Sequence, residues 1–208
     1  MAHFPVFIDI ESKKCLVIGG GRVAARKVET LCQYGAAVRV ISPEVCREIV
    51  LLFSSPDRAG CSINQKALKR EELAEEIREA VLVVAASGDR ETNHQTALIS
   101  QRLGIPVNVV DAPSECTFLF PAVVKKGNIS VGINTGGQSP IVSAWIRRET
   151  EENIPDYYAD IADQLGVLRQ EIRERIPQVE MRRAFLKKAA ALAFEKKRAL
   201  TEKEIEEL

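Results

Sequence analysis

Three consecutive glycines, Gly19, Gly20 and Gly21, separate a short apolar run from a helix-forming stretch. The apolar run at residues 15–18 predicts a buried strand. Residues 22–35 place apolar side chains at helical spacing and end on Gly35, a common helix stop. Glycines carry a large backbone entropy cost, so a run of three predicts that something must approach this backbone closely. A strand, a glycine turn and a helix in this order predict the first unit of an α/β fold.

The rest of the first half continues the alternation of strands and helices. Further strands are predicted within residues 36–42, 61–67, 81–87 and 105–111, and further helices within 43–53, 69–80 and 91–103. The run at residues 81–86 is apolar throughout, which is typical of a strand buried on both faces of a sheet. This pattern predicts an α/β fold with a parallel sheet and helices on both faces.

After residue 111 the pattern changes. Residues 118–135 predict a hairpin around a Lys-Lys-Gly-Asn turn. Ser139 and Pro140 suit the N-cap and first position of a helix, and Thr201 and Glu204 form a capping box. We therefore predict an α/β domain at residues 1–112, a small β region at 113–145 and a helical region at 146–208.

Composition excludes several classes of protein. Lys and Arg balance Asp and Glu at 29 each, which gives no basic excess for nucleic acid. No apolar run is long enough to span a bilayer, and the first residues do not resemble a signal peptide, so no membrane partner is expected. The cysteines are odd in number and lack a C-x-x-C pair, and only two histidines occur. We expect no resident metal, no disulfide framework and a reducing cytoplasmic location.

The segment Gly19-Gly20-Gly21-Arg22-Val23-Ala24 matches the pattern G-x-G-x-x-G/A. In that pattern the first glycine permits a tight turn, the second lets a pyrophosphate approach the backbone, and the small third residue lets the helix pack on the sheet. The free N–H groups at the helix N-terminus favour an anion. We interpret the turn as a dinucleotide site, with a plain tight turn as the alternative.

The end of the second predicted strand leaves the choice of dinucleotide open. An acidic residue is expected there to bind the ribose hydroxyls. The chain instead has Ser42, Pro43 and Glu44, with Glu44 two residues late. This position alone does not separate NAD from NADP.

The stretches FPVFIDIESKKCLVIGGGRVAARKVETL and VNVVDAPSECTFLFPAVVKKGNISVGINTGGQSP, together with the helical tail, resemble the precorrin-2 dehydrogenase family. This family includes the siroheme-synthase N-terminal module and the bifunctional dehydrogenase/ferrochelatase. The resemblance implies NAD-dependent oxidation of precorrin-2 to sirohydrochlorin in siroheme biosynthesis, and in some members insertion of iron(II). It also implies a Rossmann domain, a β dimerisation region, a helical region and a homodimer.

The resemblance also implies residue roles. Asp111 falls on the family's active-site aspartate, and Thr135 falls where some relatives carry serine. Asp111 ends a predicted strand, where a carboxylate could accept a proton or orient the substrate; a simple turn former is the alternative. The predicted catalytic residues are Asp111 and Thr135, and the predicted cofactor-binding residues are Gly19, Gly21, Arg22, Val23, Ser42, Pro43 and Glu44.

Two other functions remain open at this point. The same pocket could also insert iron(II), which would make the protein a sirohydrochlorin ferrochelatase as well. A non-catalytic dinucleotide-sensing module would need the Rossmann unit but would leave NVVDAPSECTFLFPA and TGGQSP unexplained. The tetrapyrrole substrate carries many carboxylates, and the cationic candidates to bind them are Lys125, Lys126, Arg147 and Arg148.

Overall fold

The computed structural model describes residues 3–58 and 60–208 and divides the chain into two compact units. The first unit is Phe4–Phe120. The second is Pro121–Leu208, together with His3. The division after Phe120 falls inside the β region predicted from the sequence, and the three-part division stays a prediction.

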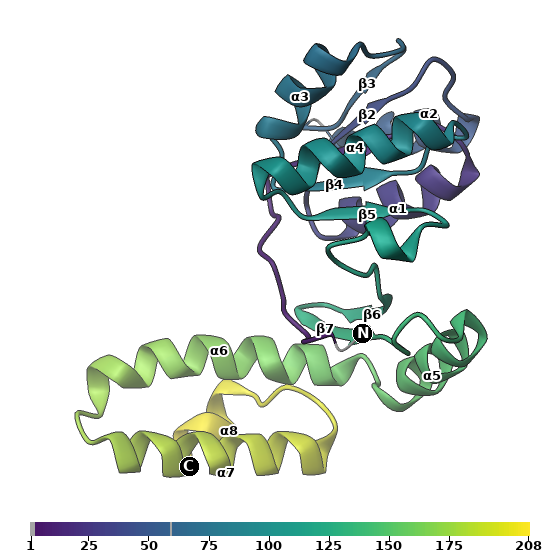
Figure 1. Ribbon diagram of the computed structural model, residues 1–208. Helices are drawn as coiled ribbons and strands as arrows, with labels where there is room; N and C mark the ends of the chain where they lie inside the picture. The colour runs from purple at the N-terminus through teal and green to yellow at the C-terminus, as the bar shows by residue number, and fades with distance from the viewer. Residues whose placement is uncertain (1–2, 59) are drawn as a thin grey trace. The chain divides into compact units, whose positions relative to one another are not determined.

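The first unit holds a five-stranded parallel sheet in the order β3-β2-β1-β4-β5 (Figure 1). The strands are β1 (Lys14–Ile18), β2 (Ala37–Ile41), β3 (Ser62–Asn64), β4 (Leu82–Ala85) and β5 (Val107–Val109). The helices are α1 (Arg22–Gln33), α2 (Arg47–Phe53), α3 (Arg70–Arg78) and α4 (Arg90–Leu103), with short 3₁₀ turns η1 (Pro56–Arg58) and η2 (Pro113–Glu115). The predicted α/β class is confirmed. The strand order reverses between β1 and β4, and the carboxyl ends at such a point are where ligands of these sheets bind.

Alternate residues of each strand face opposite sides of the sheet, so each side has its own core. Val17 and Val84 contribute to the core under α1 and α2, whereas Leu16 and Val83 contribute to the core under α3 and α4. The two helix layers explain why β1 is apolar from Cys15 to Ile18 and β4 is apolar throughout. Because both sides of these strands are packed, their carboxyl ends are held in place, and the loops that follow them start from fixed positions.

Two helix boundaries follow from local structure. Helix α1 ends where the sequence predicts, with Gly35 in the left-handed conformation at φ +71°. Helix α2 begins at Arg47, four residues later than the predicted stretch, because the preceding residues fold over the glycine turn. The N–H of Cys46 donates to the carbonyl of Gly20 at 2.8 Å.

The second unit begins with an antiparallel pair, β6 (Ala122–Lys126) and β7 (Ile129–Ile133), as the hairpin pattern predicts. Four helices follow: α5 (Pro140–Asn153), α6 (Tyr157–Arg175), α7 (Val179–Lys196) and α8 (Glu202–Glu206). Ser139 caps α5 by accepting from Val142 N, and Thr201 with Glu204 forms the predicted capping box. A separate core of α6, α7 and α8 includes Ile161 and Leu168. Among the helices of the described residues, none is both long and apolar enough to cross a membrane.

Candidate functional site

The glycine turn lies between β1 and α1, at the carboxyl ends of β1 and β4. Gly19 has φ +118°, and a Cβ there would lie 2.3 Å from the carbonyl oxygen of Ala86, just beyond β4. A Cβ on Gly20 would lie 2.1 Å from the carbonyl oxygen of Glu44. These two glycines are therefore required by contacts with the protein's own backbone.

Gly21 differs from its two neighbours. Its φ of −82° and ψ of −179° are open to any residue, and no described atom lies within 4 Å of an added Cβ. The fold gives no reason for a glycine here. The open space beside Gly21 is the close-approach position that the pattern predicts for a pyrophosphate.

The N-terminus of α1 faces this open space. Gly21 is its N-cap and provides no side-chain acceptor, and the first turn carries no acidic residue. The first N–H groups of the helix are thus available to a ligand, and the helix dipole adds partial positive charge there. Ala24 is fully buried, as the small third residue of the pattern should be. The turn fits the pyrophosphate of a dinucleotide.

The remaining predicted cofactor residues surround the turn. Arg22 and Val23 form the exposed first turn of α1, and Arg22 Nε lies 3.8 Å from a carboxylate oxygen of Glu48. Ser42, Pro43 and Glu44 follow β2, and the carbonyl of Glu44 packs against Gly20. The structure brings both groups of predicted cofactor residues to the carboxyl edge of the sheet, beside the glycine turn.

Asn93 was missed by the sequence analysis. Its side chain is only 8% exposed, accepts from Ser87 N at 3.0 Å and donates to Ser87 O at 2.9 Å. These two hydrogen bonds fix the loop after β4 against Gly19. The sequence signal was the spacing of Asn93 one helical turn before Ala97, which places its amide on the buried face of α4.

Asp111 lies two residues beyond the end of β5, at the same edge of the sheet. It is exposed and has φ +58°, a left-handed conformation that few residues other than glycine adopt. Asp tolerates this region better than most, and strained backbone of this kind is concentrated at functional sites. The geometry presents its carboxylate to solvent on a constrained turn.

Cys116 holds this turn closed. Its sulfur accepts from Val109 N at 3.1 Å and lies 3.5 Å from the carbonyl oxygen of Ala112 as a donor. On the outer side, His94 Nδ1 lies 3.0 Å from a carboxylate oxygen of Glu115, which ties η2 to α4. Cys116 and His94 therefore both make structural contacts close to Asp111.

Thr135 belongs to the second unit, in the loop before α5. Its hydroxyl lies 3.1 Å from Ser139 O and 3.0 Å from Ser143 Oγ, and it accepts from Ser139 N at 3.3 Å. These bonds fold the Thr-Gly-Gly-Gln-Ser loop onto the start of α5. The contacts of Thr135 are local to that loop.

Two of the cationic candidates are paired on the surface of the second unit. Lys126 bonds Asp156 at 2.8 Å and Arg147 bonds Glu151 at 2.6 Å. A further cation, Lys27 on α1, was not among the residues predicted from the sequence. Its Nζ lies 4.1 Å from the ring centre of Phe120. Burial lowers the pKa of Lys27.

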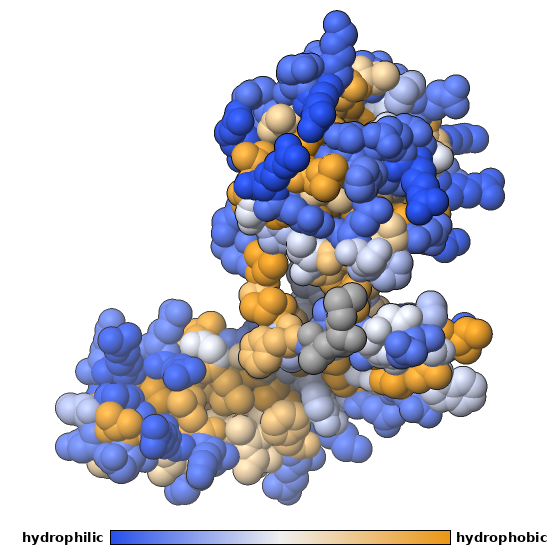
Figure 2. Space-filling model, viewed as in Figure 1, coloured by the Kyte–Doolittle hydropathy of each residue, from blue (hydrophilic) through white to orange (hydrophobic). Residues whose placement is uncertain are grey.

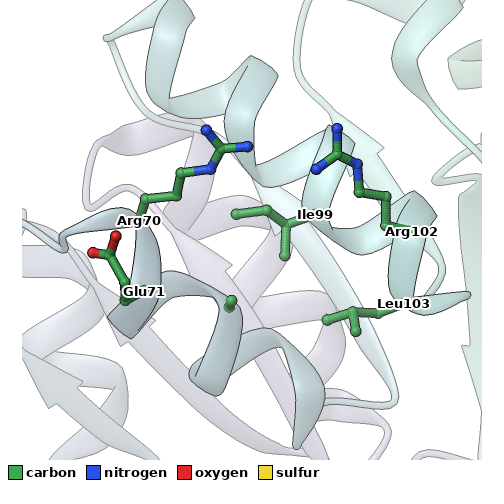
Figure 3. A pocket seen from close by; sticks show the side chains of 6 residues that line it. Arg70, Glu71, Ile99, Arg102 and Leu103 are labelled. Atoms are coloured by element: carbon green, nitrogen blue, oxygen red, sulfur yellow. The ribbon is translucent and has the colours of Figure 1, made fainter.

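An open hollow of about 320 Å³ lies between α3 and α4, away from these residues. Figure 3 shows the side chains of Arg70 and Arg102 on either side of Ile99. None of the predicted site residues lines it. Within residues 3–58 and 60–208, no group of three or more His, Cys, Asp or Glu side chains is placed to hold a metal ion.

Comparison with known proteins gives two kinds of match. A family model described as "Putative NAD(P)-binding" matches residues 6–122. The siroheme synthase of Nitrosospira multiformis is 37% identical over 89% of this chain, and that of Nitrosomonas eutropha is 36% identical over 90%. The chain spans only 39% and 38% of the lengths of these two relatives.

The fold also matches a solved structure. SirC, a precorrin-2 dehydrogenase, is similar with a TM-score of 0.67 and 24% identity, over 89% of this chain and 88% of that one. This likeness supports the arrangement of sheet and helices described above.

Proposed function

This chain belongs to the family of putative NAD(P)-binding proteins, and we propose that it oxidises precorrin-2 to sirohydrochlorin with NAD as the hydride acceptor. The observation that carries the proposal is the open space beside Gly21 at the N-terminus of α1. Similarity to siroheme synthases over most of the chain supports the choice of substrate.

NAD, when bound, supplies the acceptor for the hydride that precorrin-2 loses. The chain must hold it and provide a place for the proton. The N–H groups at the start of α1 bind the pyrophosphate, with Gly19 and Gly20 shaping the turn and Gly21 leaving room. Arg22 and Val23 line the pyrophosphate, and Ser42, Pro43 and Glu44 hold the adenosine end.

The proposed preference for NAD over NADP adds the position of Glu44 beside the glycine turn to the sequence of this segment, which alone leaves the choice open. Glu44 is exposed beside the glycine turn. A carboxylate there disfavours the extra phosphate of NADP by like-charge repulsion. The expected result is tighter binding of NAD than of NADP, and a Glu44→Gln variant should reduce the difference.

Asp111 is the proposed proton acceptor. Its position beyond β5 is at the edge where ligands of such sheets bind, and its turn is held by Cys116. An exposed carboxylate on a constrained turn is accessible to a substrate, which favours a role in the reaction over a role in the fold. We propose separately that Thr135, in the second unit, shapes the loop before α5 for the substrate.

We also propose that the protein is a homodimer through its second unit. A two-stranded sheet such as β6-β7 is marginal by itself. On α5, Ile141 is 81% exposed and Trp145 is 66% exposed, and Figure 2 shows apolar side chains at the surface of this helix. We expect a second copy of the chain to cover these exposed apolar side chains. Light scattering should give a dimer at micromolar concentration, and Trp145→Asp should give a folded monomer; a monomeric wild type would refute this.

The test of the main proposal is anaerobic incubation of the protein with precorrin-2 and NAD, with and without iron(II), followed by absorbance spectroscopy. Formation of sirohydrochlorin with NAD supports the dehydrogenase. Formation of siroheme after iron(II) is added adds ferrochelatase activity. If the protein binds the dinucleotide but does not change precorrin-2, the dehydrogenase proposal is refuted and the non-catalytic dinucleotide-sensing module is favoured.

A further inference from the structure

The sulfur atoms of Cys32 and Cys61 lie 3.8 Å apart in the first unit. Cys32 is in the last turn of α1, and Cys61 directly precedes β3. Both are free thiols, as are the other described cysteines. Neither residue belongs to the proposed dinucleotide site, so the function proposed above gives no role to this contact.

Three hydrogen bonds hold the two cysteines together. The guanidinium of Arg58 donates to the carbonyl of Cys32, and the N–H of Cys61 donates to the carbonyl of Arg58 at 2.8 Å. The thiol of Cys61 also points at the carbonyl of Ala36, at 3.7 Å. The turn η1 is thereby attached to the end of α1, and the backbone on both sides of the sulfur contact is held in place.

The two thiols differ in environment. Cys32 is 1% exposed, and burial raises its pKa to about 12, so it is protonated at neutral pH. Cys61 is only partly buried. An oxidant in solution therefore reaches Cys61 first, while Cys32 is sheltered until the sulfur of Cys61 has reacted.

We propose that Cys32 and Cys61 form an oxidative modification site that closes to an intrachain disulfide on exposure to a hydroperoxide. The Cys61 sulfur attacks the peroxide and breaks its O–O bond, giving a sulfenic acid and an alcohol, or water from hydrogen peroxide. The Cys32 sulfur then attacks that of Cys61, releasing its proton and expelling hydroxide as water. Two thiols are oxidised by two electrons and one peroxide is reduced.

The geometry permits this closure. The sulfurs must approach from 3.8 Å to the length of an S–S bond, about 2.05 Å. Cys61 is the partner with room to move, because it is only partly buried, whereas Cys32 belongs to the buried core under α1.

The disulfide would enclose residues 33–60, which include β2 and the Ser42-Pro43-Glu44 segment beside the glycine turn. A crosslink of this length constrains the unfolded chain, so the melting temperature should rise by about 5–10 °C. The proposal is independent of the substrate, and its test does not use enzyme activity.

The experiment treats the reduced, full-length protein with one to a few equivalents of hydrogen peroxide. The sample is then denatured and alkylated, and non-reducing peptide mass spectrometry identifies the blocked cysteines. We expect Cys32 and Cys61 in one linked peptide pair, released by dithiothreitol, with the higher melting temperature lost on reduction. Cys61→Ser should abolish the link, and Cys46→Ser, which removes another partly buried thiol of the same unit, should leave it intact.

Three results would overturn the proposal. Cys61 could advance to a sulfinic or sulfonic acid while Cys32 is alkylated after denaturation. Cys61 could form a link to another chain. Both cysteines could also stay alkylatable at peroxide doses that oxidise Cys46. The wild-type measurement decides among these even where a variant fails to fold.

Discussion

Replacing Gly21 with Asp should separate dinucleotide binding from stability, because the two are expected to move in opposite directions. Gly21 is the N-cap of α1, and its φ of −82° and ψ of −179° suit the extended conformation that N-cap residues adopt. No described atom obstructs the new Cβ. The substitution therefore introduces no clash in the free protein.

The stability change can be estimated from the local structure. Asp improves on Gly as an N-cap by a few tenths of a kcal/mol, and a negative charge at a helix N-terminus adds about 0.3–1 kcal/mol. The free energy of unfolding should thus rise by about 0.5–1 kcal/mol. For a chain of this size that corresponds to a melting temperature higher by about 1–4 °C.

The affinity for the dinucleotide should fall sharply in the same variant. The carboxylate occupies the space left for the pyrophosphate, repels its charge and takes up the N–H groups that would bind it. We expect affinity for NAD to weaken at least about 100-fold, equivalent to about 2.7 kcal/mol. Gly21→Asn, which has the same bulk and capping ability without the charge, should show a smaller loss.

Calorimetric titration with NAD and with NADP, beside thermal unfolding, measures both quantities. Gly166→Ala is the matched control, because Gly166 lies inside α6 of the other unit and an added Cβ also meets no described atom within 4 Å. It should be more stable by about 0.5–1 kcal/mol with unchanged affinity. A folded Gly21→Asp protein that binds NAD as the wild type does would refute the assignment of the glycine turn.

The remaining predictions concern the reaction, the loop after β4 and the pH dependence of stability. Asp111→Asn keeps the shape and the left-handed turn but cannot take up a proton, so dehydrogenation should fall by about 10²–10⁴-fold with melting temperature and NAD affinity little changed. A loss confined to apparent substrate affinity would make Asp111 a positioning residue, and no loss would remove it from the mechanism. Asn93→Ala removes both hydrogen bonds to Ser87; denaturant unfolding should show a loss of about 1–3 kcal/mol, and NAD affinity should weaken with it. Hydrogen bonds from Arg198 and its neighbours hold the pKa of Glu204 well below its usual range. Because a lowered carboxyl pKa stabilises the fold above the unfolded-state value of about 4.3, Glu204→Gln should lower the melting temperature at pH 7. That difference should shrink as the pH falls below about 4, and a difference that is constant with pH would contradict the ion-pair explanation.

Most of the fold could be predicted from the sequence because its signals are local. The two central strands, β1 and β4, are apolar at successive positions, and the helices show apolar residues at helical spacing. Caps such as Ser139 and the box at Thr201 and Glu204 depend on residues three positions apart, so they can be identified before the fold is known. The hairpin of the second unit was equally local, since its turn lies between its two strands.

The features that the sequence did not reveal depend on how particular segments fold back on one another. Asn93 reaches back six residues to Ser87 across the start of α4, and Cys32 meets Cys61 because both pack into the core on the same side of the sheet. The left-handed backbone of Asp111 likewise belongs to a turn that the sulfur of Cys116 closes. None of these contacts has a repeating pattern in the sequence, because each arises once, from packing.

The glycine turn shows how the structure adds to the motif. A plain tight turn and a dinucleotide site both predict glycine at Gly19 and Gly20, since Ala86 and Glu44 leave no room for a side chain at either position. They differ only at Gly21. A plain turn would accept, and an unliganded helix would favour, a capping side chain such as Ser or Asp at that N-cap. A glycine where the fold leaves open space, at the one position where a side chain would stabilise the helix, favours a ligand as the reason for its absence.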